Sequence, residues 1–157
     1  MFGRIRRQLL IGISTILLIP VFTLKLSGEE PMNISMDDFL WENRPILIFV
    51  ESPENANYQA LTQQIEQERA GIKDRDIVIL HLISKGQSFL GDRPISKESA
   101  RNIRQRFQPN SEVMTVVLVG KDGTEKARKT GLIDITTFFP IIDAMPMRQR
   151  EMRQQNK

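Results

Sequence analysis

The chain of 157 residues contains no cysteine and only one histidine. Without a thiol it cannot form a disulfide or perform thiol oxidoreductase or peroxidase chemistry, because both reactions need a sulfur nucleophile. One histidine and no cysteine also exclude an ordinary zinc site. His81 lies between two leucines in an apolar run, a position typical of a buried core histidine. The sequence therefore predicts no catalytic residue, no metal site and no cofactor.

The main part of the chain also lacks an excess of positive charge. Residues 1–28 contain no acid and four bases, which leaves 18 of the 22 bases in the whole chain against all 19 acids. Nucleic-acid binding depends on clustered Lys and Arg side chains that face the phosphates. We therefore expect no nucleic-acid partner. The four bases are Arg4, Arg6, Arg7 and Lys25.

The N-terminus has the pattern of an export element. Three arginines precede an uncharged run at residues 9–24, which is typical of a secretion signal or a membrane anchor. The run is shorter than the roughly 20 residues of a relaxed bilayer span and contains Pro20, which favours a cleaved signal. We expect the protein to be periplasmic or secreted. The alternative is a protein anchored in the membrane by residues 9–24, its only membrane contact.

The remainder has the length of one ordinary domain. We divide the chain into a signal peptide or signal anchor, a polar linker, one domain and a polar tail. These parts are residues 1–28, 29–35, 36–153 and 154–157.

Four segments have the character of strands. Residues 45–50 and 77–83 are continuously apolar, as in parallel strands covered on both faces. Residues 113–119 form a third apolar run, and an Asp-Gly turn at 122–123 predicts an antiparallel return along residues 125–129.

Three helices are expected between and after these strands. Ser52 and Ser96 are predicted to cap the first two, and Asp134 to cap the last. Pro140 and Pro146 each remove a backbone donor from the last helix, which should start late, kink or stop early. Residues 85–95, rich in Gly, Asp and Pro, are expected to form a loop. The order βαβαββα predicts an α/β fold with a four-stranded mixed sheet flanked by helices, preceded by the apolar signal helix.

Four pieces of the chain resemble the domain of unknown function 4174 family. They extend over about residues 36–153, and the last two are the specific ones. The resemblance implies a thioredoxin-like fold and an extracytoplasmic setting, since the family occurs in exported bacterial proteins and in animal extracellular sushi-repeat proteins. It implies no established catalytic activity. The pieces are LWENRPILIFVES, KDRDIVILHLIS, LVGKDGTEKAR and IDAMPMRQREMR.

The last two pieces contain the candidate binding residues, Lys121, Asp122, Asp143 and Arg148. Lys121 and Asp122 lie at a strand end where an anionic ligand could bind, although Asp-Gly is also what a tight turn requires. Arg148 follows a Met-Pro-Met run. The methionines are either core residues that close a helix or, with Arg148, part of an adaptable surface for a partner.

Two functional hypotheses remain open. The first is an exported, non-catalytic thioredoxin-like module with a binding or structural role, whose partner is an unidentified protein or anionic ligand of the cell envelope. The alternative is a cysteine-independent enzyme in which Glu51, Lys121 and Asp143 converge on a pocket. Thioredoxin-like enzymes place their reactive thiol where the first strand meets the first helix, and this chain has Glu51-Ser52-Pro53 there.

Overall fold

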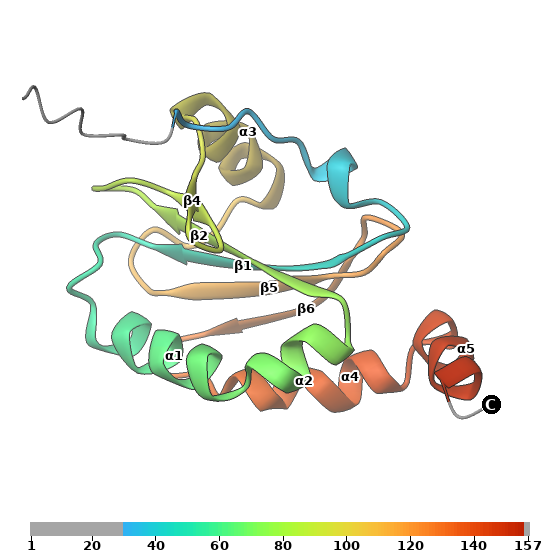
Figure 1. The fold of residues 1–157 in the computed structure, drawn as a ribbon. Helices are drawn as coiled ribbons and strands as arrows, with labels where there is room; N and C mark the ends of the chain where they lie inside the picture. Colours follow the sequence, from blue (N-terminus) through green and yellow to red (C-terminus); the bar gives the residue numbers. More distant parts are fainter. Residues whose placement is uncertain (1–29, 156–157) are drawn as a thin grey trace, which may run out of the picture.

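The computed structural model describes residues 30–155 and contains one mixed β-sheet with helices on both faces (Figure 1). The strand order is β4-β3-β2-β1-β5-β6. β1 and β2 run parallel, and each of the other neighbouring pairs is antiparallel. The strands are β1 (Arg44–Val50), β2 (Ile77–Ile83), β3 (Phe89–Leu90), β4 (Arg93–Pro94), β5 (Thr115–Val119) and β6 (Glu125–Thr130).

The helices form a layer on each side of this sheet. α1, α2 and α4 lie on one face, whereas α3 and η1 lie on the other, and α5 lies beyond the end of the sheet (Figure 1). The helical elements are η1 (Met36–Phe39), α1 (Ala56–Gln67), α2 (Arg69–Asp74), α3 (Lys97–Phe107), η2 (Ile135–Phe138), α4 (Phe139–Asp143) and α5 (Pro146–Gln155).

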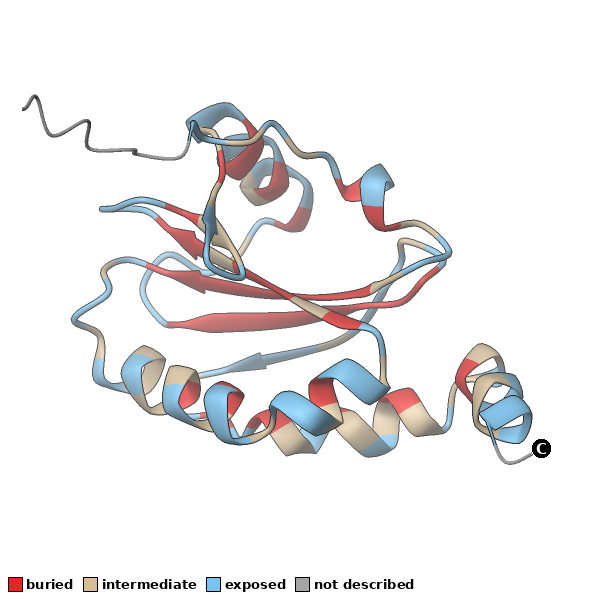
Figure 2. Cartoon of the chain, in the orientation of Figure 1, coloured by how far each residue is buried: buried red, intermediate tan, exposed pale blue. Residues whose placement is uncertain are grey.

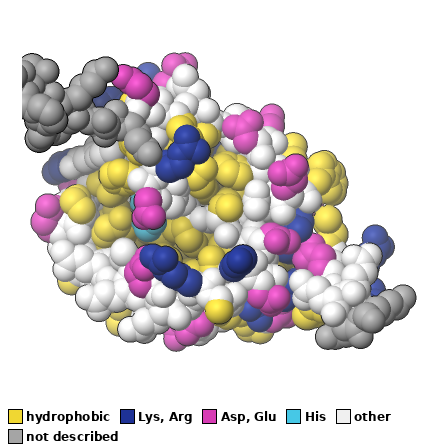
Figure 3. Space-filling model, viewed as in Figure 1, with side chains coloured by type: hydrophobic (Ala, Val, Ile, Leu, Met, Phe, Trp, Pro, Cys, Tyr) yellow, Lys and Arg dark blue, Asp and Glu magenta, His cyan; other side chains and the backbone are white. Residues whose placement is uncertain are grey.

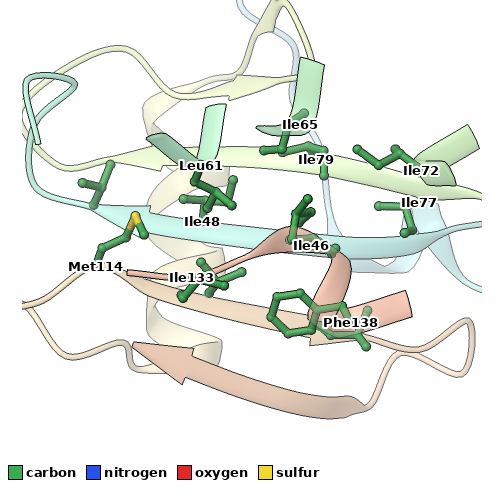
Figure 4. Close-up of a cluster of buried hydrophobic side chains, with 14 of the residues drawn as sticks. Ile46, Ile48, Leu61, Ile65, Ile72, Ile77, Ile79, Met114, Ile133 and Phe138 are labelled. Atoms are coloured by element: carbon green, nitrogen blue, oxygen red, sulfur yellow. The ribbon is translucent and has the colours of Figure 1, made fainter. Parts of the chain in front are cut away.

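Alternate residues of the central strands enter two hydrophobic clusters, one on each face of the sheet. Ile46 and Ile48 of β1 point toward α1, α2 and α4, in the cluster drawn in Figure 4. Leu47 and Phe49 enter the cluster under α3. Because side chains alternate along a strand, a strand covered on both faces is apolar along its length, and in β1 this holds from Pro45 to Val50, after the ion-paired Arg44. Every residue of β1 is accordingly buried (Figure 2).

The sheet has six strands, so the prediction of four was wrong. Residues 85–95, expected to be a loop, contain the short strands β3 and β4. Each has only two residues, too few to show a period of two in the sequence. Gly91, at φ +56°, turns the chain between them.

The first helix begins later than expected. Asn55, not Ser52, is its N-cap and accepts a hydrogen bond from the backbone N–H of Tyr58 at 3.1 Å. The Ser52 hydroxyl instead contacts the carboxylate of Glu54, two residues along. Asparagine and serine side chains can both accept hydrogen bonds from the free N–H groups at the start of a helix. In this chain Asn55 does so, and Ser52 does not cap α1.

The other two predicted caps are confirmed. Ser96 accepts a hydrogen bond from the N–H of Ser99 at the start of α3. Asp134 caps η2, after which the chain forms α4 and α5 in place of a single helix. Pro140 lies in the first turn of α4, and Pro146 begins α5, so both prolines occupy positions where their missing N–H costs little.

The predicted signal helix at residues 1–28 lies outside the described residues. Across residues 30–155, no helix has the length and apolar character needed to span a bilayer.

Candidate functional site

Eight charged side chains meet where the N-terminal ends of β1 and β2 approach α5. β5 is antiparallel to β1, so the residues that follow β5 reach the same end of the sheet. Four bases and four acids gather there, and we call them the ion-pair cluster. They are Arg44, Arg75, Lys121, Arg148, Asp74, Asp76, Asp143 and Glu151.

Glu151 of α5 connects two bases of the ion-pair cluster. Its Oε1 lies 3.0 Å from Arg44 Nη2 and 2.9 Å from Lys121 Nζ. Lys121 also lies 2.8 Å from Asp76 Oδ2, and Arg44 donates to the carbonyl of Arg75 at 2.9 Å. The side chain of Arg44 is 1% exposed and that of Lys121 is 9% exposed. Buried cations at these positions require such partners, because an unpaired buried charge is strongly unfavourable.

Arg148 holds the other side of the ion-pair cluster. Its Nη1 donates to the carbonyl of Asp74 at 2.6 Å, its Nη2 bonds to the Asp74 carboxylate, and its Nε lies 3.4 Å from Asp143 Oδ1. Arg75 meets Asp143 through two hydrogen bonds, at 3.0 Å and 2.7 Å. The planar guanidinium permits this two-pronged geometry, which a lysine cannot reproduce.

The cations lower the pKa values of two acids in the cluster. Partial burial acts to raise the pKa of Asp143, but hydrogen bonds from Arg75 and Arg148 outweigh it and hold the pKa below its ordinary value. Burial likewise acts against ionisation of Glu151, and the bonds from Arg44 and Lys121 overcome it, so that the pKa of Glu151 is also lowered. Both side chains are therefore ionised at neutral pH.

The structure brings together three of the four predicted binding residues, namely Lys121, Asp143 and Arg148. Asp122 is not among them. It bonds to Lys126 at 2.7 Å and accepts from the N–H of Thr124 at 3.1 Å within the turn. The hydrogen bond from Lys126 lowers the pKa of Asp122.

Glu51 lies far from the residues with which the alternative hypothesis grouped it. It follows the C-terminal end of β1, whereas Lys121 lies beside the N-terminal end of that strand. Glu51 pairs with Lys85 at 2.6 Å on the exposed surface. The convergence of Glu51, Lys121 and Asp143 on one pocket was therefore predicted wrongly.

Sequence reasoning missed five members of the cluster, namely Arg44, Asp74, Arg75, Asp76 and Glu151. A signal was present, since each of the four family-like segments contributes to the cluster: LWENRP supplies Arg44, KDRD supplies Asp74, Arg75 and Asp76, GKDG supplies Lys121, and the last segment supplies Glu151. Charged residues spread over several such segments can indicate a common meeting point in the fold.

A second feature is a groove beside β2, which we call the edge groove. It lies between α1–α2 and the β3–β4 turn and has a volume of about 470 Å³. Figure 3 shows this face, where hydrophobic side chains gather and Lys, Arg, Asp and Glu side chains surround them. The charged side chains are Glu66, Arg69, Lys73 and Asp92. The apolar lining comprises Ile65, Ile72, Ile77, Val78, Ile79 and Leu90.

His81 lines the edge groove and is only partly buried, so its prediction as a core residue was too simple. Its Nδ1 lies 3.1 Å from the Tyr58 hydroxyl. Burial lowers the pKa of His81, opposed by the nearby charge of Asp92, and burial raises the pKa of Tyr58. The pair is thus uncharged at neutral pH. Within residues 30–155, no three potential ligands gather as a metal site.

Solved structures with the same architecture include peroxiredoxins of Plasmodium yoelii. Thioredoxin peroxidase I of that organism matches with a TM-score of 0.54 at 12% identity, covering 74% of this chain and 80% of the other. Its Prx1a matches with a TM-score of 0.52, also at 12% identity, covering 74% and 81%. At this identity the likeness shows the fold alone, and it confirms the thioredoxin-like architecture.

Sequence relatives are longer proteins. Sushi repeat-containing protein SRPX of Homo sapiens is 24% identical over 142 residues, covering 80% of this chain and 31% of that protein. Coiled-coil domain-containing protein 80 of Danio rerio is 25% identical over 144 residues, covering 79% and 17%. The chain thus spans about a third or less of their length. The model of the family described as Domain of unknown function (DUF4174) matches residues 35–151, most of the chain with its ion-pair cluster, and the protein belongs to that family.

Proposed function

We propose that the protein is an exported thioredoxin-like module that binds another molecule without transforming it. The observation that carries this proposal is the edge groove, with its apolar lining bordered by charged side chains. Ligand sites are typically concave, mostly apolar and roughly 300–1,000 Å³ in volume, and the groove has these properties. It lies along the central sheet, which provides a rigid support for a bound partner.

The state of the charged side chains supports binding over catalysis. A general base needs a carboxylate within reach of a substrate proton. The carboxylates of Asp143 and Glu151 are already engaged by arginine and lysine. Glu51 and Ser52 lie between β1 and α1, at the position where a thioredoxin-like enzyme has its reactive thiol. The ion-pair cluster accordingly acts as a structural connection between β1, β5 and α5.

Export is part of the proposal. The three arginines followed by the uncharged run at residues 9–24 support it, as does the resemblance to a family with exported members. Protein isolated from the native host should lack residues 1–28, which intact-mass analysis of the envelope or secreted fraction would reveal. A membrane-anchored protein would retain them and sediment with the membranes. Full-length protein in the cytoplasmic fraction would contradict export.

Binding can be tested with two matched substitutions. Leu90→Arg places a charge in the edge groove, and Leu132→Arg makes the same change at a residue that is 73% exposed and does not line it. Each variant, once shown by circular dichroism to be folded, is immobilised beside the parent and exposed to envelope extract. We expect one molecular species to be retained by the parent and by Leu132→Arg but not by Leu90→Arg. After purification, this species should bind the three proteins with the same preference. Retention that is equal on all three would exclude the groove as the binding site.

A further inference from the structure

We propose that the edge groove binds an extended peptide segment of a partner protein, which joins the sheet as an added strand beside Ile77–Ile79 of β2. This inference rests on the proposed function, because it names the partner class of the same groove. It is carried by the main chain of β2, by the apolar lining and by the charges at the two ends of the groove.

The hydrogen bonds of β2 show which of its residues face the groove. Ile79 C=O accepts from Gly91 N–H at 2.9 Å, and Ile83 N–H donates to the Ser88 hydroxyl at 3.0 Å. Alternate residues of a strand direct their backbone N–H and C=O groups to the same side. The backbone groups of the odd-numbered residues of β2 therefore point away from β1. β3 pairs with Leu80 and His81 only. Within the described part of the chain, no strand pairs with Ile77 on that outer side.

Ile79 C=O already accepts from Gly91 N–H, so the groups still open to a partner on that side are the N–H and C=O of Ile77 and the N–H of Ile79. Ile77 and Ile79 are each 7% exposed, so the open part of the strand edge lies in the floor of the groove rather than on a bare surface. Backbone N–H and C=O groups that are withdrawn from water are almost always hydrogen-bonded. A peptide main chain supplies donors and acceptors at the spacing of a strand, as in other proteins that bind peptides at a sheet edge. A purely apolar ligand would leave these groups unsatisfied.

The lining of the groove suits the side chains of such a strand. Ile65 and Ile72 come from the helices on one side, and Leu90 comes from the hairpin on the other. Side chains of an added strand would alternate between these two walls. The residues that face Ile65 and Ile72 are therefore expected to be apolar, at alternate positions of a segment of about three residues opposite Ile77–Ile79, and the residue between them faces Leu90.

The charges at the two ends of the groove indicate the direction of the peptide. Lys73 lies near the start of β2, since its C=O accepts from Asp76 N–H at 3.1 Å, and among the described residues it forms no ion pair. Asp92 lies at the other end, next to the Gly91 that bonds to Ile79. A strand antiparallel to β2, continuing the direction of β3, brings its carboxyl end to Lys73 and its amino end to Asp92. The partner segment should thus be basic at its start and acidic at its end.

The test uses a six-residue probe peptide of alternating valine and threonine, with a basic first residue and an acidic last residue. Binding to the full chain is followed by the backbone amide resonances of Ile77 and Ile79 in NMR spectra. We expect both to shift and to exchange more slowly with solvent. Methylation of the peptide nitrogen opposite Ile77 removes a donor and should weaken binding about tenfold, the effect of one well-made hydrogen bond.

Two substitutions test the direction. Lys73→Glu should weaken binding several-fold, whereas Lys129→Glu, the same change at an exposed residue of β6, should leave it unaltered. Unchanged Ile77 and Ile79 amides at saturation, or equal binding of the methylated peptide, would overturn strand addition. If decanoate shifted these resonances and the peptide did not, the groove would be a site for small apolar ligands, which would overturn this inference while preserving the proposed function. If, in addition, Leu90→Arg retained the same species from extract as the parent, both strand addition and the proposed binding function of the groove would be overturned.

Discussion

The Glu151 carboxylate lies 3.0 Å from the Arg44 guanidinium, a contact between residues 107 positions apart that binds the last helix to the first strand. Few other contacts hold α5 in place. Arg148 is the buried residue of this helix, and Arg148 is also bound through ion pairs. Replacing a buried ion pair by apolar groups often leaves stability unchanged, but removing one partner leaves an unpaired buried charge, which is strongly destabilising. The position of α5 therefore depends on a few charged side chains.

Neutralising Glu151 tests this dependence. Glu151→Gln leaves the buried Arg44 with only the more distant carboxylate of Asp76, at 3.8 Å, and we expect the free energy of unfolding to fall by about 2–3 kcal/mol. Urea denaturation at neutral pH measures it. Glu112→Gln, the same chemical change at an exposed residue, should alter stability by less than about 0.5 kcal/mol. Equal losses in the two variants would show that the contact with Arg44 contributes nothing.

Arg148→Lys tests the guanidinium geometry. A lysine keeps the charge but cannot reach both Asp74 and Asp143, so a loss of about 1–3 kcal/mol is expected. Truncation after Met147 removes Glu151 as well and should cost more. Arg153→Lys, on the exposed side of the same helix, is the control. Thermal melts that coincide for all variants and the parent would refute the structural role of Arg148.

The Asp-Gly turn can be tested against a second glycine. Gly123 has φ +75° and Gly131 has φ +79°, so valine is strained at both. At Gly123 a Cβ would also lie 2.7 Å from Cδ2 of Leu40, whereas at Gly131 it would meet nothing within 4 Å. We expect Gly131→Val to destabilise by roughly 1–2 kcal/mol and Gly123→Val by roughly 2–3 kcal/mol. A smaller loss at Gly123 in denaturant melts would contradict the contact with Leu40.

The lowered pKa of His81 predicts a pH dependence of stability. In the unfolded chain His81 takes up a proton near its ordinary pKa of 6.5, while in the folded protein burial delays protonation to lower pH. The unfolded state therefore binds more protons in this interval, and stability should fall as the pH decreases from 6.5 to the folded pKa. His81→Gln should remove that part of the slope in urea titrations between pH 7 and pH 5. An unchanged slope would mean that the folded pKa is not lowered.

Local patterns in the sequence were enough to predict much of the framework. Residues 77–83 form β2 as predicted, Ser96 caps α3, and the Asp-Gly turn places Gly123 at positive φ. In each case the deciding interaction involves residues close in the chain: the covered faces of one strand, a hydroxyl and a nearby N–H, or a backbone that only glycine adopts without strain.

Only the tertiary structure decided the composition of the ion-pair cluster and the open edge of β2. Asp143, Arg148 and Glu151 are near one another in the sequence, but Asp74 joins Arg148, and Arg44 and Lys121 join Glu151, through contacts across the fold. Likewise, the sequence around Ile77 is that of any buried strand, and Ile77 has an unpaired side because β3 is two residues long and ends at Leu90, opposite Leu80. Sequence patterns record which faces of an element are apolar, whereas ion pairs and strand edges depend on which distant elements become neighbours.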